Sequence, residues 1–156
     1  MTAAIACVVD ASVAIKLFLA EGLSDRADAL FAHLAADPPG QLSVPDLFYI
    51  ECANILWKHT RRSRYPTEKA RKALTDLSRL ALKRYPTADL AAQALDIATV
   101  ENITAYDACY VALALTLSVP VVTADERLAR TLSGSKYQVH WLGDFPIPTV
   151  PPQAAN

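Results

Sequence analysis

Residues 103–127 read ITAYDACYVALALTLSVPVVTADER, and between residues 102 and 124 the only Asp, Glu, Lys or Arg is Asp107. The run has the length and composition of a buried helix, followed by the short β-branched segment 121–123, which is typical of a buried strand. An isolated carboxylate in an apolar interior has to be paired, protonated or bound to a cation. Asp125 follows the predicted strand, at the end where open α/β sheets bind ligands. The stretch therefore predicts two acids at one edge of a sheet.

A third acid occupies an equivalent place near the start of the chain. Residues 4–9 form an apolar run typical of a central parallel strand, and Asp10 ends it just before a predicted helix. A structural role remains open for these acids, because Asp10, Ser12, Asp107 and Asp125 all suit helix N-termini. One residue could cap a helix while its neighbour binds a ligand.

A fourth acid lies in a helix predicted from Pro45, as its first residue, to about Arg61. At 100° per residue, one face of this helix carries an acid, then an amide, then cations, namely Glu51, Asn54, Lys58, Arg61 and Arg62. A solvated helix face explains this pattern. The functional alternative puts the acid at a metal ion and the cations along a phosphate path.

Positive charge is concentrated in residues 58–84, which carry ten Lys or Arg against two acids, a net charge of +8 in a chain of net charge −1. A second helix, with Thr67 as its predicted cap, should pair with the first to form a basic hairpin. The charge indicates a polyanionic or acidic partner. Two solvated helices remain the alternative.

The length predicts one domain, and the alternation of predicted strands and helices predicts a three-layer α/β fold with a mostly parallel sheet. The chain has 156 residues, of which 53% are hydrophobic; we expect a domain over residues 1–145 and a proline-rich tail over residues 146–156. The three cysteines lie in apolar segments without CxxC spacing and are expected to be reduced, in a cytoplasmic protein. With no signal-peptide pattern and no uninterrupted apolar span, we expect a soluble protein without membrane contact.

Several classes of site are excluded by motif. The four glycines are too scattered for GxGxxG or a P-loop, and the three histidines show no zinc spacing. What remains is a set of four carboxylates, Asp10, Glu51, Asp107 and Asp125, three of them expected at the ligand edge of the sheet. Oxygen ligands select hard cations such as Mg²⁺ or Mn²⁺. The reaction inferred from this set is metal-assisted phosphodiester cleavage.

Three segments carry a family resemblance: VVDASVAIKLF near the start, VPDLFYIECANILWK in the middle and ITAYDACYVALALTLSVPVVTADERL near the end. In this order and spacing they resemble the PIN-domain nucleases, most closely the VapC-type toxins of bacterial toxin–antitoxin pairs. The resemblance implies a three-layer α/β/α fold with about five strands. It also implies a Mg²⁺- or Mn²⁺-dependent endoribonuclease that is a homodimer and is neutralised by a cognate VapB-like antitoxin.

The same resemblance implies residue roles. Asp10, Glu51, Asp107 and Asp125 match the metal-binding catalytic acids. Ser12 and Thr123 match hydroxyls that would hold the first and last acids in place, and Asn54 matches a polar position one turn beyond the helix acid. The RNA-binding residues are predicted to be Lys16, Lys58, Arg61 and Arg62.

Three alternatives stay open. The first is a housekeeping RNA-processing nuclease with the same chemistry, and the second is a non-catalytic RNA-binding module. The third is a phosphohydrolase of the haloacid-dehalogenase type, whose strand also ends in Asp. That class requires a DxD pair, and Ser12 stands where its second Asp should be.

Overall fold

The computed structural model describes residues 3–150 and 152. Five strands alternate with helices along the chain. The strands are β1 (Ala6–Val9), β2 (Gln41–Pro45), β3 (Lys83–Tyr85), β4 (Val121–Thr123) and β5 (Val139–Trp141). The α-helices are α1 (Ala11–Ala14), α2 (Ser24–Ala32), α3 (Leu47–Arg62), α4 (Thr67–Arg79), α5 (Ala91–Glu101), α6 (Ala105–Leu117) and α7 (Glu126–Thr131). Short 3-10 turns are η1 (Ile15–Leu17), η2 (His33–Ala35) and η3 (Thr87–Asp89).

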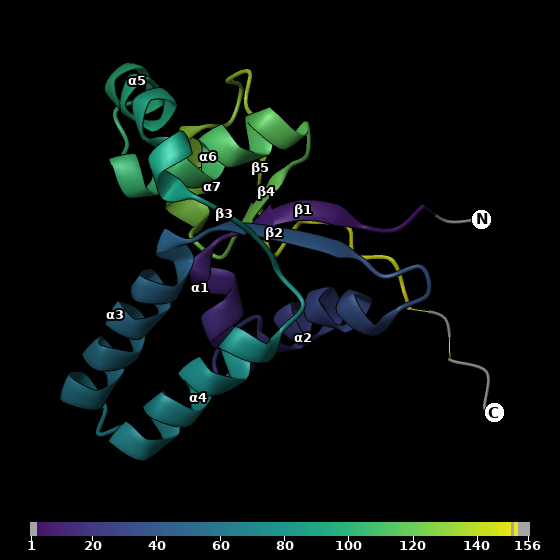
Figure 1. Cartoon of the computed structure of the whole chain (residues 1–156), viewed down its shortest axis with the longest axis vertical. Helices are drawn as coiled ribbons and strands as arrows, with labels where there is room; N and C mark the ends of the chain where they lie inside the picture. Colours follow the sequence, from purple (N-terminus) through teal and green to yellow (C-terminus); the bar gives the residue numbers. More distant parts are fainter. Residues whose placement is uncertain (1–2, 151, 153–156) are drawn as a thin grey trace.

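The sheet has the order β3-β2-β1-β4-β5, and every neighbouring pair is parallel. The chain moves outward from β1 to β2 and β3, then returns through α5 and α6 to the other side of β1. Right-handed crossovers therefore place the helices that precede this return on one face of the sheet and the helices within and after it on the other. In Figure 1, α1 to α4 lie below the strands and α5 to α7 lie above them. This confirms the predicted α/β class and three layers.

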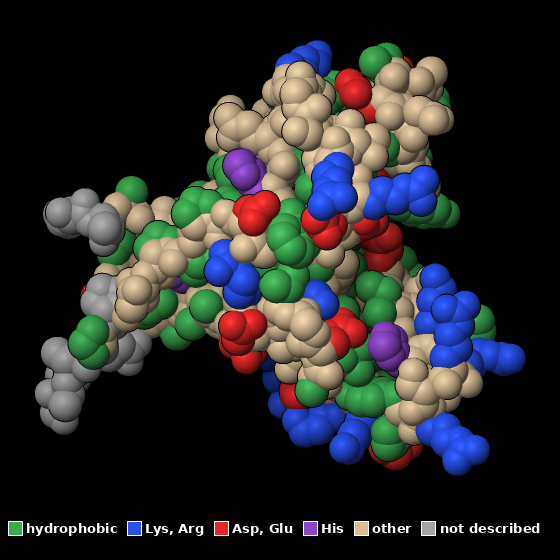
Figure 2. All heavy atoms as spheres, turned by 180° about the vertical axis from the view of Figure 1, so that it is seen from behind, with side chains coloured by type: hydrophobic (Ala, Val, Ile, Leu, Met, Phe, Trp, Pro, Cys, Tyr) green, Lys and Arg blue, Asp and Glu red, His purple; other side chains and the backbone are tan. Residues whose placement is uncertain are grey.

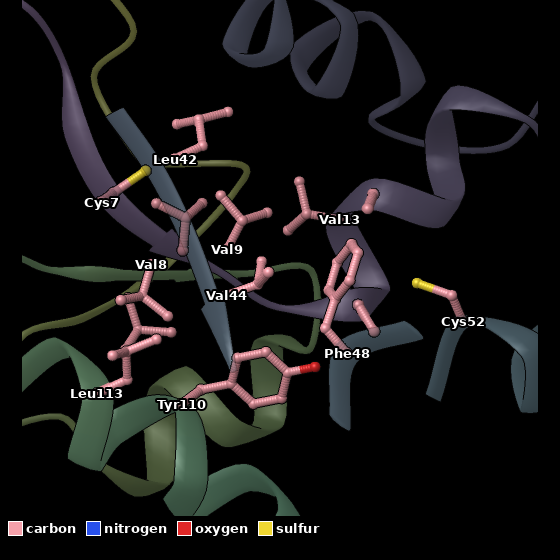
Figure 3. Close-up of a cluster of buried hydrophobic side chains, with 14 of the residues drawn as sticks. Cys7, Val8, Val9, Val13, Leu42, Val44, Phe48, Cys52, Tyr110 and Leu113 are labelled. Atoms are coloured by element: carbon pink, nitrogen blue, oxygen red, sulfur yellow. The ribbon is translucent and has the colours of Figure 1, made fainter. Parts of the chain in front are cut away.

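The central strands are apolar on both faces because helices cover both. Val8, Val9, Leu42 and Val44 have no exposed surface, and Figure 3 shows them between α1 and α3 on one side and α6 on the other. Burying such a side chain stabilises the fold by about 1.5–3 kcal/mol. The three cysteines are buried and unpaired, and burial raises the pKa of Cys7 to about 12. They are packing residues, as their apolar context predicted.

Local signals delimit the helix at the centre of the fold. The Thr104 side chain accepts a hydrogen bond from the Asp107 backbone N–H at 3.1 Å and so caps α6. At the other end Ser118 has a left-handed backbone (φ 55°), and Pro120 follows it. A left-handed residue and a proline are common helix stops. The predicted helix and strand of this stretch are both present.

Two local predictions were wrong and one strand was not predicted. Pro45 is the last residue of β2 rather than the first of α3, because parallel pairing with Tyr85 continues the strand through it. Thr67 is the first residue of α4, and Pro66 holds the cap position with extended backbone. β3 has two charged residues among its three and no alternating pattern, so only its pairing with β2 makes it a strand.

The predicted basic hairpin is formed by α3 and α4, which lie side by side and project from the sheet (Figure 1). Figure 2 shows Lys and Arg side chains gathered over it at the lower right, with Asp and Glu side chains nearer the middle of that view. No helix within the part of the chain that is described is long and apolar enough to cross a membrane.

The end of the predicted domain is anchored on α2 and the start of the predicted tail on η2. Arg26 donates hydrogen bonds to the backbone carbonyls of Leu142 and Phe145, and His33 Nε2 donates to the Pro148 carbonyl at 2.7 Å. Residues 146–150 have no regular secondary structure. The last predicted tail residues, 151 and 153–156, lie outside the described residues, so the domain boundary at 145 stays a prediction.

Candidate functional site

The site begins where the strand order reverses. β1 has β2 on one side and β4 on the other, and ligands of open parallel sheets bind at such a switch point. Asp10 follows β1 and Asp125 follows β4 by two residues. The two strand ends are tied together, since the Asp10 N–H donates to the Val122 carbonyl at 3.0 Å. Two acids far apart in sequence thus lie at one edge of the sheet.

Asp10 is held by two hydroxyl groups. Its Oδ2 accepts hydrogen bonds from Ser12 Oγ at 2.7 Å and from Thr123 Oγ1 at 2.8 Å. The same hydroxyls accept from backbone N–H groups, Ser12 from Ala124 and Thr123 from Asp125, both at 3.0 Å. Each hydroxyl has one proton, so both are committed to Asp10 and neither donates across the 3.4 Å between them. Both hydroxyls therefore hold the first acid, whereas the resemblance implies that Thr123 holds the last one.

Glu51 comes from α3 and is held by a residue from α6. Tyr110, only 2% exposed, donates its hydroxyl proton to Glu51 Oε1 at 2.6 Å. In Figure 3 the Tyr110 ring lies at the border of the apolar core with its hydroxyl directed toward α3. A short bond between a buried phenol and a carboxylate is of the strong, charge-assisted kind. It fixes one oxygen of Glu51 relative to the helix that carries Asp107.

Asp107 and Asp125 differ in their local roles. Thr104 caps α6, and no hydrogen bond ties the Asp107 carboxylate to the end of that helix among the described residues. Asp125 does cap its helix, since its Oδ1 accepts from the Leu128 N–H at 3.1 Å. The structural role considered for helix-start acids is therefore real for Asp125, and it occupies one of the two carboxylate oxygens.

The four acids interact as like charges. The pKa of Glu51 is raised to about 7, chiefly by burial and also by the charges of Asp10 and Asp107, against the lowering effect of the Tyr110 hydrogen bond. The pKa of Asp107 is raised to about 6, chiefly by burial and also by repulsion from Asp10 and Asp125. The pKa of Asp10 is also raised by burial, although its two hydroxyl donors lower it. Four elements therefore bring their carboxylates into one shared electric field.

The carboxylates are near one another without forming a closed cage. Over residues 3–150 and 152, no three His, Cys, Asp or Glu side chains are gathered closely enough to hold a metal ion. Mutual repulsion favours this open arrangement when no cation offsets it. In donor chemistry the set still fits a hard divalent cation, since it consists of oxygen ligands alone.

Three of the four predicted RNA-binding cations lie together on α3. Lys58, Arg61 and Arg62 are exposed, on the helix that also carries Glu51. Lys16 differs, because its ammonium pairs with Glu21 at 3.2 Å and its side chain is only 13% exposed. Asn54 is exposed one turn beyond Glu51 and lines a hollow with it.

Sequence reasoning missed two residues of this region. No pattern in the sequence shows that the Tyr110 hydroxyl reaches Glu51, 59 positions earlier. Tyr106 lies beside Asp107 and is 66% exposed although it is a large aromatic residue. In the sequence, the available signal was an aromatic residue directly beside a lone acid; its exposure, which marks a binding surface, is seen only in the structure.

The chain is similar in sequence to a known protein family and to individual members of it. The PIN domain family model matches residues 7–132. The chain is 39% identical over 124 residues to Ribonuclease VapC9 of Mycobacterium tuberculosis, covering 80% of this chain and 89% of that protein. It is 36% identical over 124 residues to Ribonuclease VapC3 of Pyrobaculum aerophilum, covering 78% and 91%.

A solved structure shares the fold at low sequence identity. The crystal structure of VapBC2 from Rickettsia felis, bound to a DNA fragment from its promoter, superposes with a TM-score of 0.62 and 11% identity, covering 88% of this chain and 98% of that one. The matched family segment contains the strand ends, the helix acid and all four carboxylates described above. On its sequence and its five-stranded parallel sheet, this chain belongs to the PIN domain family.

Proposed function

We propose that this protein is a divalent-metal-dependent endoribonuclease and the toxin of a toxin–antitoxin pair. The observation that carries the proposal is the meeting of Asp10, Glu51, Asp107 and Asp125, from four different elements, in one electric field at the switch point of the sheet. Repulsion between like charges destabilises the folded protein. This loss of stability is explained if the site has to bind a cation and a phosphodiester.

Each acid has a distinct task in the proposed site. Asp10 is the most rigid ligand, because two hydroxyls hold its Oδ2. Glu51 and Asp125 each have one oxygen held by the protein, through Tyr110 and the α7 cap. Asp107 is half-buried, and Thr104 rather than its carboxylate caps α6. A bound Mg²⁺ or Mn²⁺ would supply Lewis acidity toward the phosphate and acidify the attacking water.

The protein's own groups also prepare the substrate. The cations of α3 attract the RNA backbone and lead it along the helix toward Glu51. An acid with a raised pKa is suited to exchange a proton near neutral pH. Glu51 has such a pKa, about 7, in the metal-free protein. We infer that it loses its proton when the cation binds.

RNA as substrate and an antitoxin as partner are inferred from the relatives. Both curated relatives are named ribonucleases, and the structural neighbour is a VapBC complex. They favour the toxin over a housekeeping nuclease and leave the dehalogenase-type alternative without support. We also infer a homodimer, for which the exposed Leu95 and Val100 of α5 and Leu115 of α6 offer apolar surface. Light scattering on the purified protein measures that state, and a monomer would contradict it.

The test is cleavage of RNA by purified protein in chelator, Mg²⁺ or Mn²⁺. Asp107→Asn should lower the cleavage rate by more than about a hundredfold, since even residues that only support metal ligands contribute about ten- to a hundredfold to activity. It should leave the fold intact, because it removes a repelled charge. Expression of the protein in bacteria should arrest growth, and the variant should not.

Asp28→Asn is the matched control, because Asp28 is exposed on α2 outside the site. It should cleave as the parent does. Undiminished cleavage by Asp107→Asn would refute the site assignment. Cleavage that persists fully in chelator would refute the metal dependence.

A further inference from the structure

A hollow of about 390 Å³ opens beside the acids, between α3 and the start of α6. It is lined by Ile50, Glu51, Asn54, Ile55, Lys58 and Tyr106. One end is a carboxylate of the proposed catalytic site and the other is a cation. Along the helix axis seven residues separate the two, about 10 Å. The proposed catalytic acids explain only the end of the hollow that holds Glu51. The middle of the hollow is therefore available for a separate binding role.

The walls of the hollow are unusually apolar for an exposed surface. Ile50 is 70% exposed and Tyr106 is 66% exposed, and both stand next to acids of the site. Solvent contact of large apolar side chains at such a place indicates a binding surface. Tyr106 offers an aromatic face, and Asn54 offers an amide that can both donate and accept hydrogen bonds. An aromatic ring beside an amide is suited to recognise the flat face and polar edge of a base.

The hollow continues into a cationic one. A second hollow of about 180 Å³ shares Ile55 and Lys58 with it and is lined further by His59, Arg62 and Ser63. On the neighbouring flank of α3, the Arg61 guanidinium lies 5.5 Å from the centre of the Trp57 ring. The helix thus presents in succession a carboxylate, an apolar and aromatic hollow, and a row of cations. A nucleic acid strand has the matching succession of reacting phosphate, base and further phosphates.

We propose that this hollow is a subsite for one unpaired base of single-stranded RNA, stacked against Tyr106 and Ile50, with an adjoining phosphate on Lys58. The inference rests on the proposed ribonuclease function and adds to it the place on the surface where one base is held. A paired base could not enter, because stacking on a side chain requires that the base leave its own helix. The row of cations favours a polyanionic strand over an apolar peptide as the occupant.

The test compares two probes, a short labelled single-stranded oligoribonucleotide and the same strand with abasic sites. Binding is measured by fluorescence anisotropy in chelator, so that no cleavage occurs. Tyr106→Ala should weaken binding of the intact strand about tenfold, as loss of one base–aromatic stack does. It should change binding of the abasic strand little. Tyr106→Phe keeps the ring and should bind both strands as the parent does.

A second variant separates the phosphate contact from the base contact. Lys58→Ala should lower the salt slope of binding by about 0.7 for both strands, because one phosphate contact is lost whether or not a base is present. Tyr106 is largely exposed, so its truncation leaves folding intact, and a thermal melt checks this.

The outcomes distinguish this inference from the function on which it rests. If the parent protein cleaves the intact strand in Mg²⁺ but Tyr106→Ala binds both strands like the parent, the subsite is wrong and the nuclease stands. The hollow would then be open to a peptide partner. Equal weakening for intact and abasic strands also overturns base stacking. A parent protein that neither binds nor cleaves RNA overturns the proposed function and the subsite together.

Discussion

The carboxylate edge of the sheet and the basic hairpin differ in how their charges are held. At the edge, Asp10 is 8% exposed and fixed by two hydroxyls, and Glu51 is fixed by a buried tyrosine. On the hairpin, ion pairs such as Arg71–Glu68 are exposed on both sides. Exposed pairs contribute little to stability, whereas buried charges are costly and sensitive to their partners. The edge of the sheet holds its carboxylates in fixed positions, whereas the hairpin carries exposed charges that can attract a charged partner.

The difference predicts that the supports of the edge matter for chemistry. Tyr110→Phe removes the hydrogen bond from Tyr110 to Glu51. In the parent this hydrogen bond holds the Glu51 carboxylate in place and lowers its pKa. Cleavage should fall about tenfold, as for other residues that orient a ligand. The pKa of Glu51 should rise, so the pH profile of cleavage should move to higher pH. Rates measured across the pH range check both effects.

Tyr137→Phe is the control, since Tyr137 is half-buried beside α6 and outside the acid site. It should keep both the rate and the pH profile of the parent. A Tyr110→Phe enzyme with the rate and the pH profile of the parent would contradict the positioning of Glu51, because this variant keeps the ring and loses only the hydroxyl.

Charges of the hairpin should matter for affinity alone. Arg61→Ala combined with Arg62→Ala removes two exposed cations, so RNA binding should weaken several-fold and its salt slope should fall by about 1.4. The free energy of unfolding should change by less than about 0.5 kcal/mol for each exposed position. Binding titrations at several salt concentrations and a denaturant melt measure the two quantities.

Arg130→Ala combined with Lys136→Ala removes the same charge elsewhere, from α7 and the loop that follows it. This pair should leave the salt slope unchanged. If the α3 pair leaves the slope unchanged as well, RNA binds to another face, and the hairpin charges serve a different partner.

The smallest expected effect is on stability. Without metal, the folded pKa of Glu51 is about 7 against an ordinary 4.5, so the folded state holds a proton that the unfolded state releases between those values. Stability should therefore fall as the pH rises through this window, with the full penalty above about pH 7. Melting temperatures in chelator should drop by a few degrees.

Glu51→Gln removes one titrating group and should weaken this dependence, of which Asp107 keeps a part because its pKa is raised as well. Glu68→Gln, on the exposed part of α4, should retain it. A parent protein whose melting temperature rises steadily from pH 5 to pH 8 would contradict the raised pKa of Glu51.

Local patterns were sufficient for much of the fold. The helix and strand of residues 103–123 follow from a largely apolar run with Thr104 near its start and Pro120 within it, because capping and backbone stops act over a few residues. The positions of Asp10 and Asp125 just after strands also follow from local apolar runs. The placement of Pro45 failed, because a proline can end a strand or begin a helix, and only pairing with β3 decides between them.

By itself, the sequence determined that lone acids end two strands and enter two helices, and that cations follow Glu51 along one helix face. Only the tertiary structure decided that Tyr110 supports Glu51, that one hydroxyl pair serves Asp10, and that Tyr106 faces α3 across a hollow. The physical reason is range. Periodicity and capping depend on neighbours within a few residues. Tyr110 and Glu51 are 59 positions apart and Thr123 and Asp10 are 113 apart, so only the packing of the sheet and helices brings them together.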